Sequence, residues 1–358
     1  MDMVAEPDKI KAVSRSSDWL ADGGTMGARI RAFDWSNHPL GPLEAWPQSL
    51  KIAVRIMLTS RYAMWLGWGT EFYFFCNDAY LPTVGIKESW VLGASARQVW
   101  AEIWPDIGPR AETVVATGKA TWDESLLLFL ERSGYVEETY HTFSYSPISD
   151  DDGSTGGMLC VVTEDTERVI GERRLRLLRE LAADLTQTNT EEEVCQVASR
   201  QLSSDDKDLP FALLYLFEAN AETNGWQARL VCASATTPLD ETIAPPVIEL
   251  ANAAALWPAQ AVWREAEALT VADLAAQKVV PPMGPWQQPT RQALVIPLAQ
   301  QGQEHPAGFL VAGLNPLRAL DASYRGFISL LAGQITAALA NARAYEAERR
   351  RVAALAEL

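Results

Sequence analysis

The sequence predicts an α+β protein with two domains, each an antiparallel sheet with flanking helices, joined and followed by long helices. Three observations support this fold class. The chain has 358 residues, which is long enough for about two domains of ordinary size. Its apolar residues alternate in some segments, as in strands, and recur at three- and four-residue steps in others, as in helices. Turn-forming Gly, Pro, Asn and Asp residues separate these segments.

Charge and composition argue against several classes of protein. Hydrophobic residues make up 48% of the chain, which is enough to give each domain a core. The formal net charge of −16 repels nucleic acid phosphates and anionic lipids. No run approaches the roughly 20 apolar residues that span a bilayer, and the opening stretch MDMVAEPDKIKAV lacks the pattern of a signal peptide. We therefore expect a cytoplasmic protein that binds neither nucleic acid nor membrane.

The cysteines and histidines predict neither a metal site nor a catalytic centre. The cysteines are far apart in the sequence and fit buried, reduced thiols; they are Cys76, Cys160, Cys195 and Cys232. The histidines have no metal-ligand spacing, since His38 and His305 each precede a proline and His141 lies in a predicted strand. The phosphate-binding, dinucleotide-binding and nucleophile-elbow motifs are absent from the sequence. We therefore expect that this chain is not itself an enzyme.

The first 60 residues predict a loose terminus followed by a helical cap. Residues 1–20 are polar, and we expect them to be flexible. Residues 21–60 contain two apolar helical runs on either side of a Pro/Gly turn at His38 to Pro42. In the second run, Ile52, Ile56 and Met57 fit an apolar helical stripe.

Residues 61–166 predict a five-stranded domain. The aromatic runs YAMWLGWG and FYFFCN flank Gly69-Thr70-Glu71, which is the pattern of a β-hairpin. Asn77 or Asp78 can then cap a short helix. A helix is predicted from about residue 103 to 117, ending at Gly118, and three strands follow in TWDESLLLFL, YVEETYHTFSYSPI and GGMLCVVTEDT.

The second half predicts a connector helix over residues 167–188, a mixed domain over 189–320 and a C-terminal helix over 321–358. Strands are expected in FALLYLF, QARLVCAS, RQALVIPLA and GFLVAGL, with a helical stretch ending near Trp257. Both long helices have an apolar seam that fits a dimeric coiled coil, and the seam of the C-terminal helix continues less regularly through Val352 and Leu355. The predicted interface residues are Leu175, Leu178, Leu181, Leu185, Phe327, Leu331, Ile335, Ala338, Ala342 and Tyr345.

The stretch from Met26 to Glu172 resembles the N-terminal PAS-type sensory domain of bacterial sensor histidine kinases. The phrases that carry the resemblance are MGARIRAFDWSNHPLGPLEAWPQSL, FYFFCNDAY, VWAEIWPDIGP, EETYHTFSYSPI and GGMLCVVTEDTERV. The resemblance implies a five-stranded antiparallel sheet with helices over one face and a small-molecule pocket between them. Its candidate ligand contacts are Trp65, Phe75, Asn77, Tyr80, Trp104 and Tyr145. For each single ring, packing in the core is the favoured interpretation, and Asn77 fits a helix cap better than a ligand contact. Tyr140 and Tyr145 lie an odd number of residues apart, so only one of them can face a pocket.

The second half resembles a GAF domain, another sensory fold. The phrases that carry this resemblance are TEEEVCQVASRQL, RQALVIPLAQQGQEHPAGFLVAGL and DASYRGFISLLAGQITAALANARAYEAERR. The sequence lacks the cysteine or histidine cluster of bilin-binding relatives, the cyclic-nucleotide residue set and the flavin-adduct cysteine phrase of PAS relatives. We therefore predict no cofactor and leave open an unknown small-molecule ligand.

Together the resemblances imply the PAS–GAF sensory region of a bacterial (hybrid) sensor histidine kinase of a two-component system. Its expected partners are a second copy of the chain and a downstream kinase domain or response regulator, with the kinase output outside this chain. Three alternatives stay open at this point: a GAF-type thiol reductase with Cys232 as nucleophile, a bilin-binding photoreceptor, and a structural dimerisation scaffold whose cavities are filled by side chains.

Overall fold

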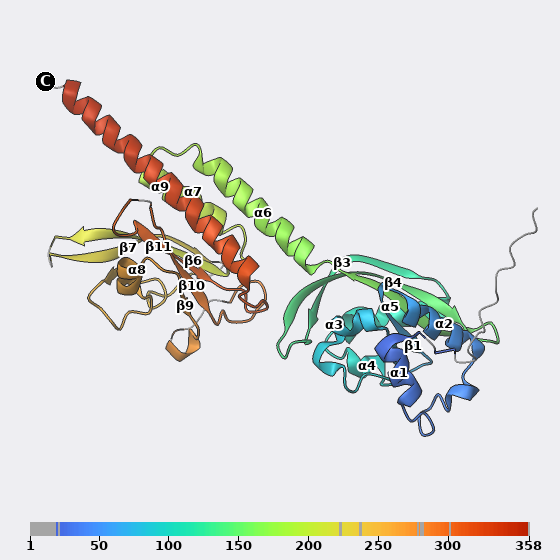
Figure 1. Cartoon of the computed structure of the whole chain (residues 1–358). Helices are drawn as coiled ribbons and strands as arrows, with labels where there is room; N and C mark the ends of the chain where they lie inside the picture. The colour runs from blue at the N-terminus through green and yellow to red at the C-terminus, as the bar shows by residue number, and fades with distance from the viewer. Residues whose placement is uncertain are drawn as a thin grey trace, which may run out of the picture. The chain divides into compact units, whose positions relative to one another are not determined.

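The chain divides into two compact units, Met1–Glu167 and Arg168–Leu358, in a computed structural model (Figure 1). The structure describes residues 19–20, 22–221, 224–235, 238–277, 279, 283–300 and 302–356. Most of the predicted flexible terminus, residues 1–20, lies outside this range. Its described end is packed: Leu20 is buried, and the ring of Trp19 lies 6.0 Å from that of Trp46. No helix in the described part of the chain is both long and apolar enough to cross a membrane.

The first unit is built around a five-stranded antiparallel sheet in the order β2-β1-β5-β4-β3. Its strands are β1 Ala63–Trp68, β2 Tyr73–Cys76, β3 Thr121–Leu130, β4 Glu137–Ser149 and β5 Thr155–Glu164. Its helices are α1 Gly24–Ala32, α2 Gln48–Thr59, α3 Leu81–Val84, α4 Ala96–Val99 and α5 Trp104–Thr117. The predicted hairpin, long helix and three further strands all form. Helix α5 ends as expected at Gly118, whose positive φ of 65° suits glycine.

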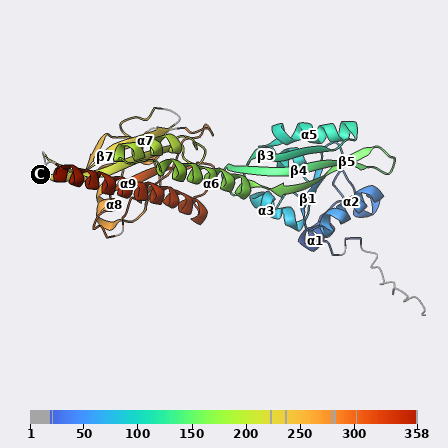
Figure 2. The same cartoon turned by 90° about the horizontal axis from the view of Figure 1, so that it is seen from above.

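Helices cover both faces of this sheet, with α5 on one side and α1 and α2 on the other (Figure 2). This arrangement explains the aromatic run of β2. Successive side chains of a strand point to opposite faces, and both faces are covered by helices. The Phe75 ring stacks on Trp35 of the cap at 5.7 Å, whereas the Phe74 ring stacks on Trp65 at 5.3 Å. The resemblance implied helices over one face, and the helical cap predicted for residues 21–60 covers the other.

The predicted stripe of helix α2 is wrong for the two isoleucines. Ile52 is 51% exposed and Ile56 is 54% exposed, although Met57 is buried as expected. The buried side chains follow a different helical face; they are Leu50, Ala53, Val54, Met57 and Leu58. This set has the i, i+3, i+4, i+7, i+8 spacing, and it includes an alanine that a search for large apolar residues undervalues.

Asp78 caps a helix, but one far away in the sequence. Its carboxylate accepts hydrogen bonds from the backbone N–H groups of Thr25 (2.7 Å) and Met26 (2.8 Å), at the start of α1. A carboxylate at this end of a helix satisfies free donors and opposes the helix dipole. Gly24 leaves room for it, because a Cβ there would lie 2.3 Å from Asp78 Oδ2. Asn77 makes no capping bond to the short helix that follows it.

The second unit contains a six-stranded antiparallel sheet in the order β8-β7-β6-β11-β10-β9. Its strands are β6 Phe211–Asn220, β7 Gly225–Ala235, β8 Val247–Glu249, β9 Leu269–Val271, β10 Ala293–Pro297 and β11 Gly308–Gly313. Its helices are α6 Thr166–Leu185, α7 Glu191–Leu202, α8 Ala259–Glu265 and α9 Ala322–Ala356. The helix predicted to end near Trp257 is wrong, because Pro245 and Pro246 interrupt that stretch and β8 follows them. The helix α8 begins only after Trp257.

Strand β6 is buried on both faces and divides the core of the second unit into two layers. Leu214 and Leu216 pack with side chains of α6, α7 and α9, whereas Leu213 and Tyr215 pack on the side of α8 (Figure 1). Helix α7 begins with a capping box, in which the Thr190 hydroxyl accepts from the Glu193 N–H and the Glu193 carboxylate accepts from the Thr190 N–H.

Candidate functional site

A small cavity lies in the first unit between the sheet and helix α5. Its volume is about 30 Å³, which is room for about one or two water molecules. The side chains that line it come from β1, β3, β4, β5, α5 and the segment between β2 and α5; they are Trp65, Tyr80, Thr83, Trp100, Ile103, Ile107, Leu128, Leu130, His141, Phe143, Tyr145, Cys160 and Val162. The cavity is therefore almost filled by side chains of its own unit.

Strand alternation and register bring the sheet residues of the cavity together. His141, Phe143 and Tyr145 occupy alternate positions of β4 and so share one face. In the register of the sheet, Tyr145 lies opposite Cys160 of β5, and Cys160 lies opposite Trp65 of β1. The Trp65 and Tyr145 rings meet edge to face at 5.6 Å. This wall is rigid because three neighbouring strands hold it.

The polar groups of the cavity are uncharged at neutral pH. Burial lowers the pKa of His141 to about 4. Burial also raises the pKa of Tyr80 and of Tyr145 well above their ordinary value. The Trp100 Nε1–H is buried and has no hydrogen-bond partner among the described residues. A buried donor without a partner is costly, so the site favours an uncharged molecule that carries a hydrogen-bond acceptor.

Three of the six predicted ligand contacts lie together on this cavity, namely Trp65, Tyr80 and Tyr145. The other three do not line it. Phe75 faces the cap, and the Trp104 ring packs 5.9 Å from the ring of Phe72 with the guanidinium of Arg97 5.1 Å above it.

Asn77, the last of the three, has a structural role. Its amide nitrogen donates to the carbonyl oxygens of Met57 (3.1 Å), Ser60 (3.2 Å) and Tyr62 (2.7 Å). Its amide oxygen accepts from the N–H of Met64 at 3.0 Å. The side chain thereby ties the end of α2 to the start of β1, a different role from the predicted helix cap.

The prediction missed Trp100 and His141, the cavity residues with the most informative chemistry. His141 lies two residues from Phe143 and four from Tyr145, so strand alternation alone places it on the same face. Trp100, Ile103 and Ile107 have helical spacing, which was a signal for one common face beside the sheet.

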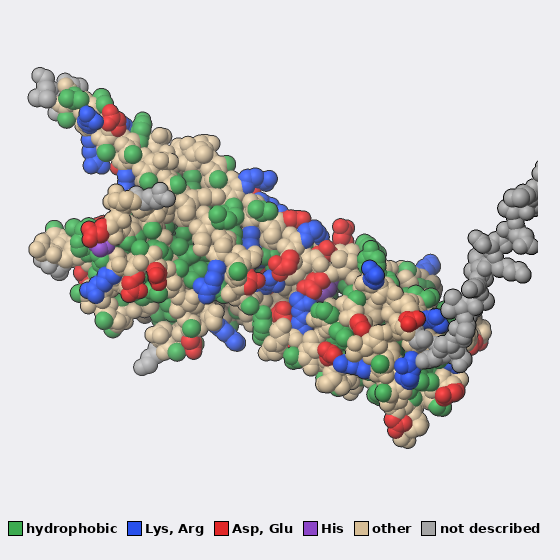
Figure 3. All heavy atoms as spheres, viewed as in Figure 1, with side chains coloured by type: hydrophobic (Ala, Val, Ile, Leu, Met, Phe, Trp, Pro, Cys, Tyr) green, Lys and Arg blue, Asp and Glu red, His purple; other side chains and the backbone are tan. Residues whose placement is uncertain are grey.

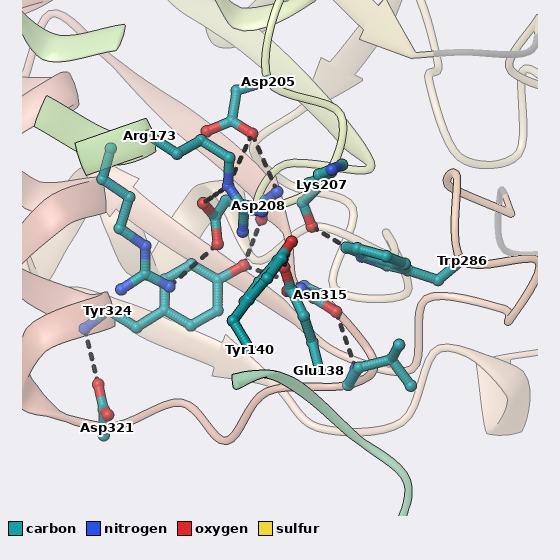
Figure 4. Close-up of polar contacts among 12 residues, drawn as sticks. Glu138, Tyr140, Arg173, Asp205, Lys207, Asp208, Trp286, Asn315, Asp321 and Tyr324 are labelled. Carbon is teal, nitrogen blue, oxygen red and sulfur yellow. Dashed lines mark hydrogen bonds and ion pairs between the residues drawn. The ribbon is translucent and has the colours of Figure 1, made fainter. Parts of the chain in front are cut away.

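The second unit has a buried ionic site, which we call the Asp208 cluster: Arg173, Arg174, Asp205, Asp208 and Tyr324 (Figure 4). The Asp208 carboxylate is fully buried and accepts from Arg173 Nε at 2.8 Å and from Arg174 Nη2 at 3.1 Å. The Tyr324 hydroxyl donates to the backbone oxygen of Asp208. The Arg174 guanidinium also lies 4.2 Å above the Tyr324 ring. The cluster therefore joins α6, the segment before β6 and the start of α9.

Asp205 is the member of the cluster whose ionised form is destabilised. Burial and the neighbouring charge of Asp208 raise its pKa to about 6, against the opposing effect of Arg173. Its Oδ2 is buried without a hydrogen-bond partner among the described residues. The cluster thus holds a carboxylate that ionises with difficulty between α7 and β6.

Most of the predicted dimer seam is buried inside the second unit itself. Seven of its residues lie in the core against the unit's own sheet and helices, and Leu178 is partly buried; the seven are Leu181, Leu185, Phe327, Leu331, Ile335, Ala338 and Ala342. Only Leu175, at 67%, and Tyr345, at 48%, are largely exposed. The buried seam residues are therefore not available to a second copy in this conformation, and the dimer remains a prediction.

The four cysteines are all buried and free. Burial raises the pKa of Cys232, as it does for the other three, and Cys232 in turn contributes to the raised pKa of Cys195. A thiol is nucleophilic as the thiolate, so a raised pKa makes Cys232 a poor nucleophile.

On the face drawn in Figure 3, neither basic nor acidic side chains dominate. Blue Lys and Arg side chains and red Asp and Glu side chains are interspersed there, among green hydrophobic ones. An extended basic surface, which nucleic acid binding would require, is absent from this face.

Comparisons with known proteins concern mainly the second unit. The chain is 20% identical to the GAF domain of a putative sensor histidine kinase from Pseudomonas syringae pv. tomato, over 50% of this chain and 97% of that one, with a TM-score of 0.33. It is 12% identical to the photosensory core module of the Stigmatella aurantiaca phytochrome, over 83% of this chain and 60% of that one, with a TM-score of 0.37.

A third similar structure is free methionine-R-sulfoxide reductase from Neisseria meningitidis, at 13% identity over 48% of this chain and 90% of that one, with a TM-score of 0.34. No curated protein matches the chain. The model of the GAF domain family matches residues 188–340, a range that runs from the residues before α7 through the whole six-stranded sheet into α9. The chain therefore contains a GAF domain at these residues.

Proposed function

We propose that this chain is a sensory module of a signalling protein, in which the first unit holds a small uncharged ligand and the GAF domain passes the signal to helix α9. The observation that carries the proposal is the cavity of the first unit, which aromatic side chains line together with Trp100, whose buried Nε1–H has no hydrogen-bond partner among the described residues. An apolar lining with few polar groups is typical of ligand sites, and this cavity must enlarge to hold a ligand.

The first unit is PAS-like in this proposal. Its five antiparallel strands, with helices on the cavity side, agree with the fold that the sequence resemblance implies. The cavity of about 30 Å³ has room for about one or two water molecules. A ligand larger than water must move Trp100 or Tyr80, and it shifts the equilibrium only if it binds the open arrangement better.

The Asp208 cluster supports a path to α9 within the second unit. It fixes Arg173 and Arg174 of α6 to the segment before β6, and it fixes Tyr324 at the start of α9 to the same segment. A displacement of α6 therefore affects the position of α9, because both helices are bonded to the same buried segment. The receiver in this proposal is a histidine kinase domain or a response regulator.

A second copy of the chain is the other partner in the proposal. Beyond Ala342, helix α9 exposes apolar side chains at coiled-coil spacing, namely Tyr345, Val352 and Leu355. Pairing of these residues in a dimer would remove them from water. Replacement of both Val352 and Leu355 by Glu should then produce monomers in sedimentation without loss of helix content, and an unchanged dimer would locate the interface elsewhere.

Native mass spectrometry of the full chain tests the ligand proposal. After incubation with a small-molecule cell extract, the wild type should carry an uncharged molecule that denaturation releases. Val162→Phe, which fills the cavity, should lose that molecule while remaining folded. If the wild type carries no added mass, or if Val162→Phe carries the same molecule, the ligand proposal is wrong.

A further inference from the structure

A second pocket, which the proposed function does not use, lies on the second unit. Its volume is about 570 Å³, within the range of small-molecule sites. We call it the Trp226 pocket. Its walls come from the end of β6, the start of β7, the end of α8, the connection between β10 and β11, and α9; the residues used below are Phe217, Trp226, Trp263, Gln300, His305 and Arg343.

Aromatic rings form one wall of the Trp226 pocket. The Trp263 ring lies 4.4 Å from that of Trp226 and is stacked on His305 at 4.1 Å. Phe217 meets Trp263 edge to face at 4.8 Å. His305 Nδ1 donates to the backbone oxygen of Trp263 at 3.0 Å, which fixes the imidazole ring. Trp226 is nevertheless 46% exposed, so this rigid stack presents an open aromatic surface.

Hydrogen-bond donors without partners lie in the same pocket. The Gln300 Nε2 is buried and has no hydrogen-bond partner among the described residues. Arg343 uses its Nε for an ion pair with Glu191 at 2.8 Å, and its side chain stays 39% exposed. The Nη groups of a guanidinium form a fork that fits a carboxylate.

We propose that the Trp226 pocket binds a planar aromatic carboxylate, with its ring against Trp226 and its carboxylate against Arg343 and Gln300. Stacking on an aromatic side chain accepts any planar ring, so the ring alone gives little selectivity. The carboxylate gives selectivity because it satisfies the buried amide and takes up the free fork of Arg343.

An organic cation is the competing ligand, since aromatic faces also attract cations and Glu304 lines the pocket. Glu304 is exposed, however, and water already satisfies its carboxylate. The amide nitrogen of Gln300 is shielded from water, so it gains most from a new acceptor. The buried Gln300 amide needs an acceptor more than the exposed Glu304 carboxylate needs a donor, so the pocket favours an aromatic carboxylate over an organic cation.

Titration calorimetry of the full chain with three indole probes separates these ligands. Indole-3-carboxylate should bind saturably, and its neutral isostere indole-3-carboxamide should bind about tenfold more weakly, the factor expected for losing a charged hydrogen bond. Tryptamine, which carries a cation on the same ring, should bind more weakly still.

Two variants assign the binding to this pocket. Arg343→Gln should weaken binding of the carboxylate by about tenfold and change binding of the carboxamide by less than about threefold. Trp226→Ala should weaken binding of both probes by about fivefold or more, because it removes the stacking surface. Matched controls are Arg200→Gln, an exposed ion-paired arginine of the same unit, and Trp122→Ala, an exposed tryptophan of the first unit; neither should alter binding.

Three results would overturn the proposal: no saturable binding of the carboxylate, tryptamine binding as tightly as the acid, or unchanged affinity in both pocket variants with their fold intact. These outcomes are independent of the proposed sensory function, because Val162→Phe affects only the cavity of the first unit.

Discussion

The cavity of the first unit and the Asp208 cluster of the second bury polar groups in opposite ways. In the cavity, His141, Tyr80 and Tyr145 are kept neutral by burial, and the Trp100 donor has no partner within the described part of the chain. In the cluster, Asp208 is fully buried but paired with two arginines. The difference shows that the first site can still gain from a bound molecule, whereas the second already has its partners and holds helices in place.

The largest expected effect concerns the paired site. Asp208→Ala should lower the free energy of unfolding of the second unit by about 3–5 kcal/mol, because it leaves the buried Arg174 and the half-buried Arg173 without the Asp208 carboxylate. Chemical denaturation measures the loss. Asp184→Ala, which removes the half-exposed partner of the exposed Arg200, should change stability little. Equal effects of the two variants would show that the Asp208 cluster does not hold the unit together.

Acid should weaken the first unit through His141. The pKa of His141 in the folded chain is about 4, below the ordinary value of 6.5, so the unfolded chain binds the proton first as pH falls. This residue should therefore cost up to about 3 kcal/mol of stability between pH 6.5 and 4. Denaturation of wild type and His141→Leu across this range measures the difference, and parallel pH profiles would contradict the expectation.

Asp205 should act in the opposite direction in the second unit. Its pKa is raised from 3.8 to about 6, so its contribution to stability is complete below pH 3.8 and is lost as the pH rises through 6. Asp205→Asn should remove this loss, and the variant should gain stability relative to the wild type as the pH rises from 4 to 7. Denaturation of both proteins at these pH values checks it; a constant difference between them would show that Asp205 does not titrate as stated.

Asn77 should behave as a structural residue. Asn77→Ala removes four hydrogen bonds that join residue 77 to the end of α2 and the start of β1, and about 2 kcal/mol of stability should be lost from the first unit. Ligand binding, measured by native mass spectrometry at a temperature where the variant is folded, should persist. Loss of the ligand with little loss of stability would restore Asn77 as a ligand contact.

Tyr145→Phe should have the smallest effect on stability. The hydroxyl of Tyr145 lies in the cavity wall, and its removal leaves the ring and its contact with Trp65 in place. The free energy of unfolding should change by less than about 0.5 kcal/mol. A loss above about 1 kcal/mol in a denaturation experiment would mean that the hydroxyl makes a structural bond.

Strand periodicity and turn residues predicted the sheet of the first unit well, as β3 shows: it spans the residues of the predicted segment TWDESLLLFL. The site was harder to predict because it depends on which face of a strand meets α5. Phe74 and Phe75 look alike in the sequence, and only the register of β2 with β1 sends Phe75 to the cap. Trp65 and Tyr145, in contrast, come to the cavity through their pairing with Cys160.

The spacing of the helical seams does not determine what they pack against, for a related reason. The apolar stripe of α9 has the same spacing whether it packs against its own sheet or against a second copy. Ile335 is fully buried in the unit, so Ile335→Glu should unfold the unit rather than separate two intact copies. The exposed Val352 and Leu355 are the residues that can test pairing.

Hydrogen exchange of β4 and β5 in the full chain, measured with benzamide, benzoate and benzamidine, tests most directly whether the first unit takes an uncharged ligand. These probes share a ring and differ in charge. Benzamide alone should slow exchange in these strands, since a ligand that binds the folded state protects it, and Val162→Phe should abolish the effect. Equal protection by a charged probe, protection that survives in Val162→Phe, or no protection by benzamide would contradict the account.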